Sequence, residues 1–280
     1  MAFMVYYVRT AMTLCDKAYN HLSRMLARGV LKPDQKLSER SVSLACGVSR
    51  IPVREAIRRL VEEGVLYQKS QSGTYVARLD RQQIVDAYEV REAIETYQMR
   101  KAMPRLTDAQ KRRLSESCDA QLAIIREFRA SGKPVLSGKP EQDFLAHDFF
   151  FHLQLLKAAG NRLAEKIVTT AYRRNRFFGL HSHRRDLTHL AWTWRYHRRM
   201  ADAILADDAD AAVFWMRQHI LRSKKDALKQ FDDQSEKRSL PSHYTHLHSR
   251  ARRKRNGREA PFASRRSSGI VGRGSRLENG

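Results

Sequence analysis

Four polar side chains in the second half of the chain have residue types and spacing suited to binding a metal ion. Asp148 and His152 are four residues apart, so on a helix they share one face. His197 and His219 lie in two later stretches with helical periodicity. If the three segments pack together, the four side chains form a site for zinc, nickel, manganese or iron, with coordination positions left open. Spacing alone also fits ordinary core or surface histidines.

Other histidines compete for the same role: His147, His181, His183 and His189. The side chain of His147 points about 100° away from that of Asp148 on a helix, which makes it a poor partner. His181 and His183 lie in a polar stretch that is typical of a solvated loop.

A second pattern is typical of nucleic-acid recognition. A short helix is expected to begin after Ser49, with Arg50 and Arg54 one turn apart on its outer face. Ser49 is expected to cap it by accepting from the amide of Ile51. Guanidinium groups at such a position can bind guanine or phosphate, although solvated arginines on an ordinary surface helix are the alternative. The opposite face is apolar: Val53, Ile57 and Leu60.

The flanking residues predict a winged helix-turn-helix. A short helix over 37–45 is capped by Ser38, and Gly47 opens the turn before the arginine helix. Two short strands, 65–69 and 74–77, enclose a turn and predict a β-hairpin wing. The helix over 14–28 completes this first domain.

Residues 10–79 resemble the winged helix-turn-helix of the GntR family of bacterial transcription regulators. Asp34 departs from the glycine usual in that family, in a turn that aspartate tolerates. The resemblance implies that Arg40, Arg50 and Arg54 contact DNA, with Ser49 and Gly73 near its backbone. It rests on the motifs Gly29-x-Leu31-x-Pro33, Leu37-Ser38-Glu39, Val48-Ser49-Arg50-x-Pro52-Val53-Arg54-Glu55-Ala56, Glu63-Gly64 and Gly73-Thr74-x-Val76.

Charge and composition agree with a nucleic-acid partner. The net charge is +23, of which residues 1–79 carry +7, and basic domains bind polyanions by releasing counterions. There is no run of 18 apolar residues, no signal-peptide pattern at the start and no Cys-x-x-Cys spacing. We therefore expect a bacterial cytoplasmic protein associated with the nucleoid, with no membrane partner and no disulfide framework.

The expected fold is mostly α with a small β wing: an N-terminal winged helix-turn-helix and a C-terminal all-α antiparallel helical bundle over 80–230. Residues 231–280 are rich in Ser, Arg and Gly and are expected to form a disordered basic tail. That tail is expected either to solubilise the chain or to bind DNA without sequence choice. Six helices are expected in the bundle: 82–102, 107–130, 141–159, 161–180, 186–206 and 208–230.

The bundle resembles the FCD domain of the FadR subfamily of GntR regulators. The resemblance implies that the four metal-type residues line an effector cavity, in which many members hold a divalent metal. It also implies that Arg91 faces the cavity and pairs with an effector carboxylate, with a salt bridge to Glu95 as the alternative. The motifs are Asp148-x-x-Phe151-His152-x-x-Leu155-x-x-Ala158-x-Gly160-Asn161, then His197-x-x-Met200-x-x-Ala203-Ile204-x-x-x-Asp208-x-x-Ala211, and His219.

These features predict a sequence-specific regulator that binds an operator in double-stranded DNA as a homodimer and responds to a small carboxylate metabolite. The chain is not expected to be an enzyme, because it has no Gly-rich phosphate loop, no Gly-x-Ser-x-Gly motif and no Glu base beside the ligands. Two alternatives remain: a metal-dependent hydrolase and a protein that coats DNA without sequence choice.

Overall fold

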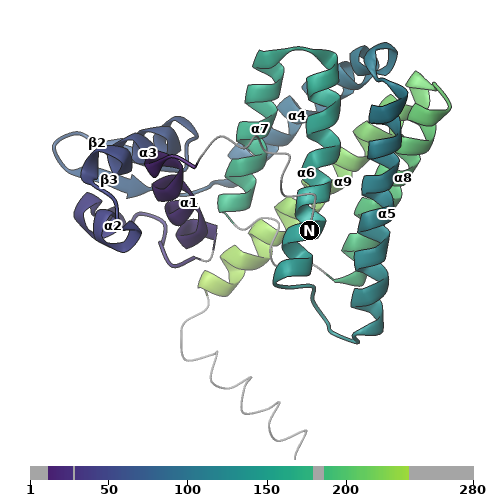
Figure 1. The fold of residues 1–280 in the computed structure, drawn as a ribbon. Coiled ribbons are helices and arrows are strands. Elements are labelled where there is room, and N and C mark those ends of the chain that lie inside the picture. Colours follow the sequence, from purple (N-terminus) through teal and green to yellow (C-terminus); the bar gives the residue numbers. More distant parts are fainter. Residues whose placement is uncertain (1–11, 28, 179–185, 240–280) are drawn as a thin grey trace, which may run out of the picture. The chain divides into compact units, whose positions relative to one another are not determined.

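The N-terminal part of the chain folds as three helices and a small sheet (Figure 1). This computed structural model describes residues 12–27, 29–178 and 186–239. The expected mostly helical fold with a β wing is confirmed. The helices of this part are α1 (Leu14–Ala27), α2 (Glu39–Cys46) and α3 (Arg50–Glu62).

The turn between α2 and α3 depends on a cap and a glycine. Ser38 caps α2 by accepting from the amide of Ser41 at 3.3 Å. Gly47 ends the helix with a φ of +61°, a left-handed conformation that glycine adopts without strain. Ser49 lies at the N-cap of α3, but its side chain makes no capping hydrogen bond, so that expectation was wrong. Because Ser49 is exposed, water can satisfy the first amides of α3 instead.

The wing is a three-stranded antiparallel sheet: β1 (Lys36–Leu37), β2 (Leu66–Lys69) and β3 (Gly73–Val76), in the order β1-β3-β2. The expected hairpin of β2 and β3 is present. The sequence did not reveal β1, because two residues are too few to show an alternating pattern. Asp34, just before β1, has a φ of +63°, which explains why glycine is usual there, and its carboxylate accepts two hydrogen bonds from Arg78.

Apolar side chains three or four residues apart form the core beneath α3. Ala18 and Leu22 of α1 and Val53, Ala56 and Leu60 of α3 have no exposed surface. Burial of such a side chain contributes roughly 1.5–3 kcal/mol, so this core fixes the side of α3 that remains exposed.

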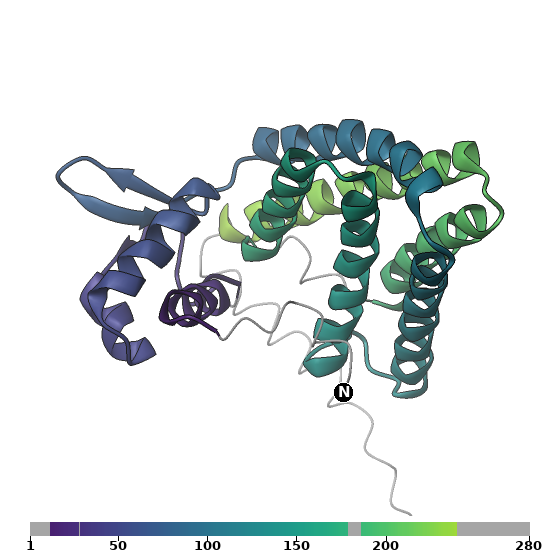
Figure 2. The same cartoon turned by 45° about the horizontal axis from the view of Figure 1, so that its top comes forward.

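The C-terminal part is helical throughout the residues that the structure describes (Figure 2). None of the described helices is both long and apolar enough to span a membrane. Thr107 caps the second helix in a reciprocal capping box with Gln110, and Asp208 caps the last by accepting from Ala211 at 2.9 Å, as expected. The helices are α4 (Arg81–Ala102), the 3-10 turn η2 (Met103–Arg105), α5 (Asp108–Ala130), α6 (Lys139–Ala159), α7 (Arg162–Phe177), α8 (Leu187–Leu205) and α9 (Ala209–Ser239).

The last helix is longer than expected. It continues to Ser239, so residues 231–239 of the segment expected to be disordered are helical. Part of the reason is that Phe231 still packs against the apolar core of the bundle. The rest of the expected tail, 240–280, lies outside the described residues, as do His181 and His183.

Helices α4 and α9 lie side by side and antiparallel (Figure 2). Exposed ion pairs contribute little to stability, so the buried apolar side chains beneath them hold the bundle together. Four ion pairs connect the two helices: Arg81–Asp232, Glu89–Lys224, Glu92–Arg217 and Arg100–Asp210. Large members of the core are Tyr88, Met99, Leu114, Phe151, Met200 and Ile220.

The core beneath α3 is testable with two leucines. Leu60→Ala should lower the free energy of unfolding by about 2–5 kcal/mol, because it leaves a cavity under the helix. The control Leu44→Ala, at a leucine that is 75% exposed, should change it by less than about 0.5 kcal/mol. Denaturant unfolding measures both, and equal effects would contradict this description of the core.

Candidate functional site

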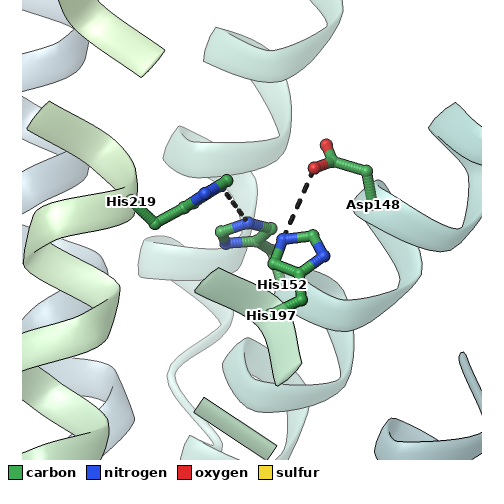
Figure 3. A group of neighbouring side chains, drawn as sticks. All are labelled: Asp148, His152, His197 and His219. Carbon is green, nitrogen blue, oxygen red and sulfur yellow. Dashed lines mark hydrogen bonds and ion pairs between the residues drawn. The ribbon is translucent and has the colours of Figure 1, made fainter. Parts of the chain in front are cut away.

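The structure brings together the four side chains that the sequence singled out (Figure 3). Asp148 and His152 come from α6, His197 from α8 and His219 from α9. Their ligand-type atoms all lie within 4.8 Å of one another, with the histidines buried and Asp148 partly exposed. The packing of α6, α8 and α9 therefore brings together four side chains whose proximity the sequence could only suggest.

A buried carboxylate sets the orientation of His152. Its Nδ1 lies 2.5 Å from Oε2 of Glu95. A carboxylate can only accept, so Nδ1 carries a proton, and in the neutral ring this leaves a lone pair on Nε2. That Nε2 faces the Nε2 of His219 at 3.2 Å.

A buried amide does the same for His197. The carbonyl oxygen of Gln121 accepts from Nδ1 at 3.0 Å. The Nε2 of His197 is buried without a hydrogen-bond partner and lies 3.5 Å from Oδ1 of Asp148. A parallel stack on Phe151, with ring centroids 4.7 Å apart, holds the ring in this orientation.

Two of the spacings among these atoms are close to those of ligands on one divalent metal ion. Two ligands bound to one ion at about 2.1 Å and at angles of about 90–109° are about 3.0–3.4 Å apart. The observed 3.2 Å and 3.5 Å distances are close to this range. Burial, reinforced by the neighbouring histidines, holds the pKa values of His197 and His219 well below the usual range. Both rings therefore stay neutral, as metal ligation requires.

Behind His152 lies a buried ion pair. Arg91 donates from Nε to Glu95 at 2.8 Å and from Nη2 to the hydroxyl of Tyr172 at 2.5 Å. Burial alone would raise the pKa of Glu95, but the charge of Arg91, together with the hydrogen bonds from His152 and Arg91, outweighs it and lowers this pKa. The salt bridge that the sequence left as an alternative is present.

A small cavity borders the cluster. Arg91, Asp148 and His219 line it, so its wall includes the arginine of the ion pair and two of the predicted ligands. The hydroxyl of Tyr88, another lining residue, is buried without a hydrogen-bond partner, and burial raises its pKa to about 12. The cavity volume is about 40 Å³, which is space for water rather than for a metabolite.

The competing histidines that the structure describes lie outside the cluster. His147 is buried on another face of α6, where its Nδ1 lies 3.0 Å from the hydroxyl of Ser117. His189 lines the cavity, but its Nδ1 pairs with Asp226 at 3.4 Å.

All the residues expected to bind DNA are exposed: Arg40, Ser49, Arg50, Arg54 and Gly73. Arg54 donates to the carboxylate of Glu39 in α2 at 2.8 Å, which restricts its side chain at the surface of α3. Gly73 has a φ of +120°, which favours glycine at the wing tip.

Sequence reasoning missed two kinds of residue. Gln121 had no signal, since only the packing of α5 against α8 shows which polar side chain reaches His197. Ile51, at the start of α3, is 77% exposed. The spacing of apolar residues along this helix did not predict that a large apolar side chain would be exposed there.

Two family profiles match the chain. That of the bacterial regulatory proteins of the gntR family matches residues 14–76, and that of the FCD domain matches residues 86–222. Together they cover the winged part and most of the helical part, including every residue of the histidine cluster.

Individual relatives give the same result. An uncharacterised HTH-type transcriptional regulator of Streptomyces ambofaciens is 29% identical over 208 residues, which are 72% of this chain and 80% of that protein. The HTH-type transcriptional repressor RspR of Escherichia coli K12 is 31% identical over 149 residues, 53% of this chain and 60% of the repressor.

Solved structures share the fold. Escherichia coli McbR/YncC aligns over 78% of this chain and 99% of its own, with a TM-score of 0.64 and 17% identity. A putative GntR regulator from Rhodococcus sp. RHA1 aligns over 77% of this chain and 97% of its own, with a TM-score of 0.57 and 18% identity.

The buried ion pair can be tested against an exposed one. Arg91→Ala should lower the free energy of unfolding by about 3–5 kcal/mol, because it leaves the Glu95 carboxylate buried without its main partner. Arg100→Ala, which removes an exposed pair with Asp210, should cost no more than about 1 kcal/mol. If thermal or denaturant unfolding shows equal losses, Arg91 does not stabilise the site in the way described.

Proposed function

Because the chain belongs to the GntR family of DNA-binding transcriptional regulators and carries an FCD domain, we propose that a ligand in its helical domain controls its affinity for an operator. The ligand would bind at a divalent metal held by Asp148, His152, His197 and His219. The metal would supply a positive charge and open coordination positions for an anionic group.

One observation carries this proposal. The Nε2 atom of His197 is buried without a hydrogen-bond partner, and it faces Asp148 beside two more imidazoles whose Nε2 atoms face each other. An acceptor left unpaired in a dry interior is costly, and a bound cation would remove that cost. Zinc, nickel, manganese and iron all accept this ligand set.

A small carboxylate is the ligand class that the cavity favours. The Tyr88 hydroxyl is a buried donor without an acceptor, and Arg91 adds positive charge to the same wall. Since Arg91 already binds Glu95 and Tyr172, its contact with the ligand would be additional. A metabolite exceeds a volume of about 40 Å³, so binding would have to displace the surrounding helices. A ligand that prefers a widened cavity shifts the population of conformations.

The other half of the proposal is DNA binding by a homodimer. Arg40, Arg50 and Arg54 would reach bases or phosphates, with Ser49 and Gly73 near the backbone. One winged module contacts few base pairs, and two modules can read half-sites a helical turn apart. The neighbouring helices α4 and α7 expose large apolar side chains that a second copy could cover: Val90, Tyr97, Leu163 and Ile167.

We further propose that the protein acts at the nucleoid of a bacterial cell, since a regulator acts where the chromosome is. The name of the Escherichia coli relative supports repression as its mode of action. The family and the relatives are transcriptional regulators and not enzymes, so the hydrolase alternative is set aside. Coating of DNA without sequence choice remains the competitor, and a footprint that survives excess unrelated DNA would distinguish the two.

The metal site gives a direct prediction. His197→Ala and His219→Ala should each fold and bind DNA but lose most of the metal that the native chain retains after dialysis. His147→Gln, at a buried histidine that faces Ser117, is the matched control and should retain metal. Elemental analysis of the purified proteins measures this, and stoichiometric metal in both alanine variants would show that these histidines only pack.

The surface proposed to bind DNA gives a second prediction. Arg50→Ala should weaken binding to an operator selected from genomic fragments by about 1–3 kcal/mol, because a bidentate contact to a guanine or a contact to a phosphate is lost. Arg58→Ala removes the same charge from the same helix, but its side chain pairs with Glu62 near the far end, so it should have less effect. Fluorescence anisotropy at fixed salt compares them. Equal affinities of the native and Arg50→Ala proteins would place the DNA-binding surface elsewhere.

A further inference from the structure

We propose that helix α7 transmits the state of the cavity to the end of the DNA-recognition helix α3 through two adjacent side chains, Tyr172 and Arg173. The described residues up to Asp233 form one compact unit, and within it α7 has one side on the cavity and one side on the winged domain. The inference deepens the proposed function, since it names how a ligand at that site would reach the DNA-binding surface.

On the cavity side, Tyr172 ends a continuous chain of hydrogen bonds. It starts at Nδ1 of His152, passes through the two oxygens of Glu95 and then through the Nε and Nη2 atoms of Arg91. The Arg91 guanidinium also lies 3.9 Å from the centre of the Tyr172 ring, and Phe149 packs against the ring edge. A displacement of His152 or of the cavity wall would therefore displace the Tyr172 side chain through these hydrogen bonds.

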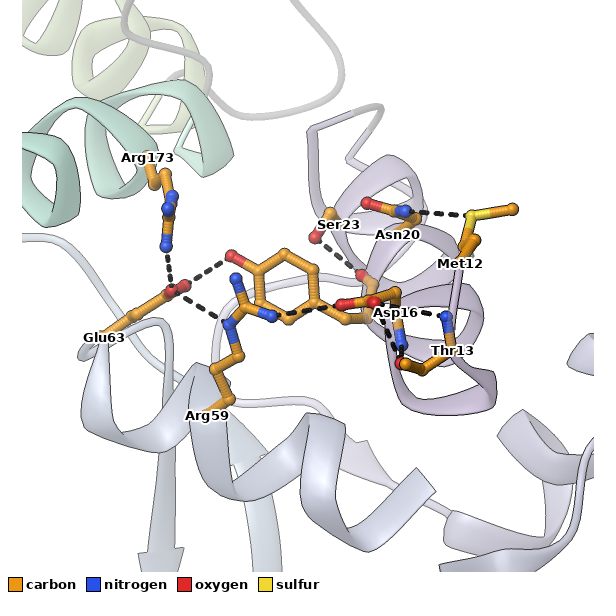
Figure 4. Close-up of polar contacts among 9 residues, drawn as sticks. Met12, Thr13, Asp16, Asn20, Ser23, Arg59, Glu63 and Arg173 are labelled. Carbon is orange, nitrogen blue, oxygen red and sulfur yellow. Dashed lines mark hydrogen bonds and ion pairs between the residues drawn. The ribbon is translucent and has the colours of Figure 1, made fainter. Parts of the chain in front are cut away.

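On the winged side, Arg173 binds a buried carboxylate at the C-terminal end of α3 (Figure 4). Its Nη1 donates to Oε1 of Glu63 at 3.0 Å. The other oxygen of Glu63 accepts from the hydroxyl of Tyr19 in α1 at 2.7 Å. Glu63 is only 7% exposed, so its negative charge needs these partners.

One further contact joins α7 to the winged domain. Phe177 is buried in the core of the winged domain, where its ring meets Tyr19 edge-on at 6.3 Å between centroids. Arg174, in contrast, joins α7 to the helical domain, because it donates to the backbone oxygen of Gln83 in α4 at 3.3 Å. The end of α7 is thus anchored by packing as well as by charge.

Helix geometry explains how one element serves both sides. Neighbouring residues on an α-helix point about 100° apart, so Tyr172 and Arg173 face different surroundings while sharing one rigid backbone. A displacement of the α7 backbone at this point therefore moves the attachment points of both side chains together. A shift of Tyr172 would stretch the Arg173–Glu63 contact and loosen the last turn of α3.

The winged domain keeps a second cation near Glu63 when that contact weakens. The Nε of Arg59 lies 3.7 Å from the same carboxylate, and its guanidinium lies 4.0 Å above the Tyr19 ring (Figure 4). Arg173 is partly exposed, with 31% of its side-chain surface accessible. Its replacement should therefore cut the link without unfolding the winged domain.

The test is a double-mutant cycle read by hydrogen exchange on the full chain without added ligand. The variants are Tyr172→Phe, Arg173→Gln and the double variant. The observable is the exchange rate of backbone amides in residues 58–66, at the end of α3. Each single change should speed this exchange roughly twofold or more, and the double variant should exchange no faster than Arg173→Gln alone, because the link is already cut.

Two controls separate the link from charge and from folding. Lys166→Gln removes one positive charge from an exposed position on α7 and should exchange as the native chain does. Arg173→Lys keeps the cation and should restore part of the protection. Circular dichroism melts of all variants show whether global unfolding contributes.

The proposal is overturned if Tyr172→Phe changes exchange only within 80–233, or if the two changes act additively on α3. Neither result depends on metal or effector binding. The zinc content of the same variants reports on the proposed metal site separately, so a failed coupling and a failed metal site are distinguishable.

Discussion

The rest of the site depends on histidine rings that buried partners hold in fixed orientations. Glu95 and Gln121 each hold one histidine by its Nδ1 atom, so the lone pairs of His152 and His197 point inward. Burial keeps the pKa of His197 low, so a proton does not bind its Nε2 atom in place of a metal ion. Several helices must pack in register to hold these contacts, since α4, α5, α6, α8 and α9 each supply a member.

This constraint also explains the ion pair behind the cluster. Glu95 must remain ionised in order to accept from His152, and a buried carboxylate does so only beside a positive charge. Arg91 supplies that charge and extends the contact to Tyr172 on α7. The site and the helix that meets the winged domain thus belong to one polar network, whose members stabilise one another in a low dielectric.

The sequence predicted those features that depend only on residues close together in the chain. The caps at Ser38, Thr107 and Asp208 and the spacing of Asp148 and His152 all follow from helix geometry, and the structure contains them. Tertiary contacts decided the rest. The choice of Gln121 as the partner of His197 depends on how α5 meets α8, and the missing cap at Ser49 could not be read from residue type. The extension of α9 was hidden because it depends on the packing of Phe231 against the core of the bundle.

The central claim is that the state of the histidine cluster controls the affinity for DNA. The most direct measurement is the dissociation constant for a selected operator, taken at one salt concentration on the same preparation before chelation, after chelation and after zinc is restored. The account predicts a reversible change of about 5- to 150-fold, the usual size of coupling between two sites. Identical dissociation constants in all three states, with metal analysis showing that zinc leaves and returns, would contradict it.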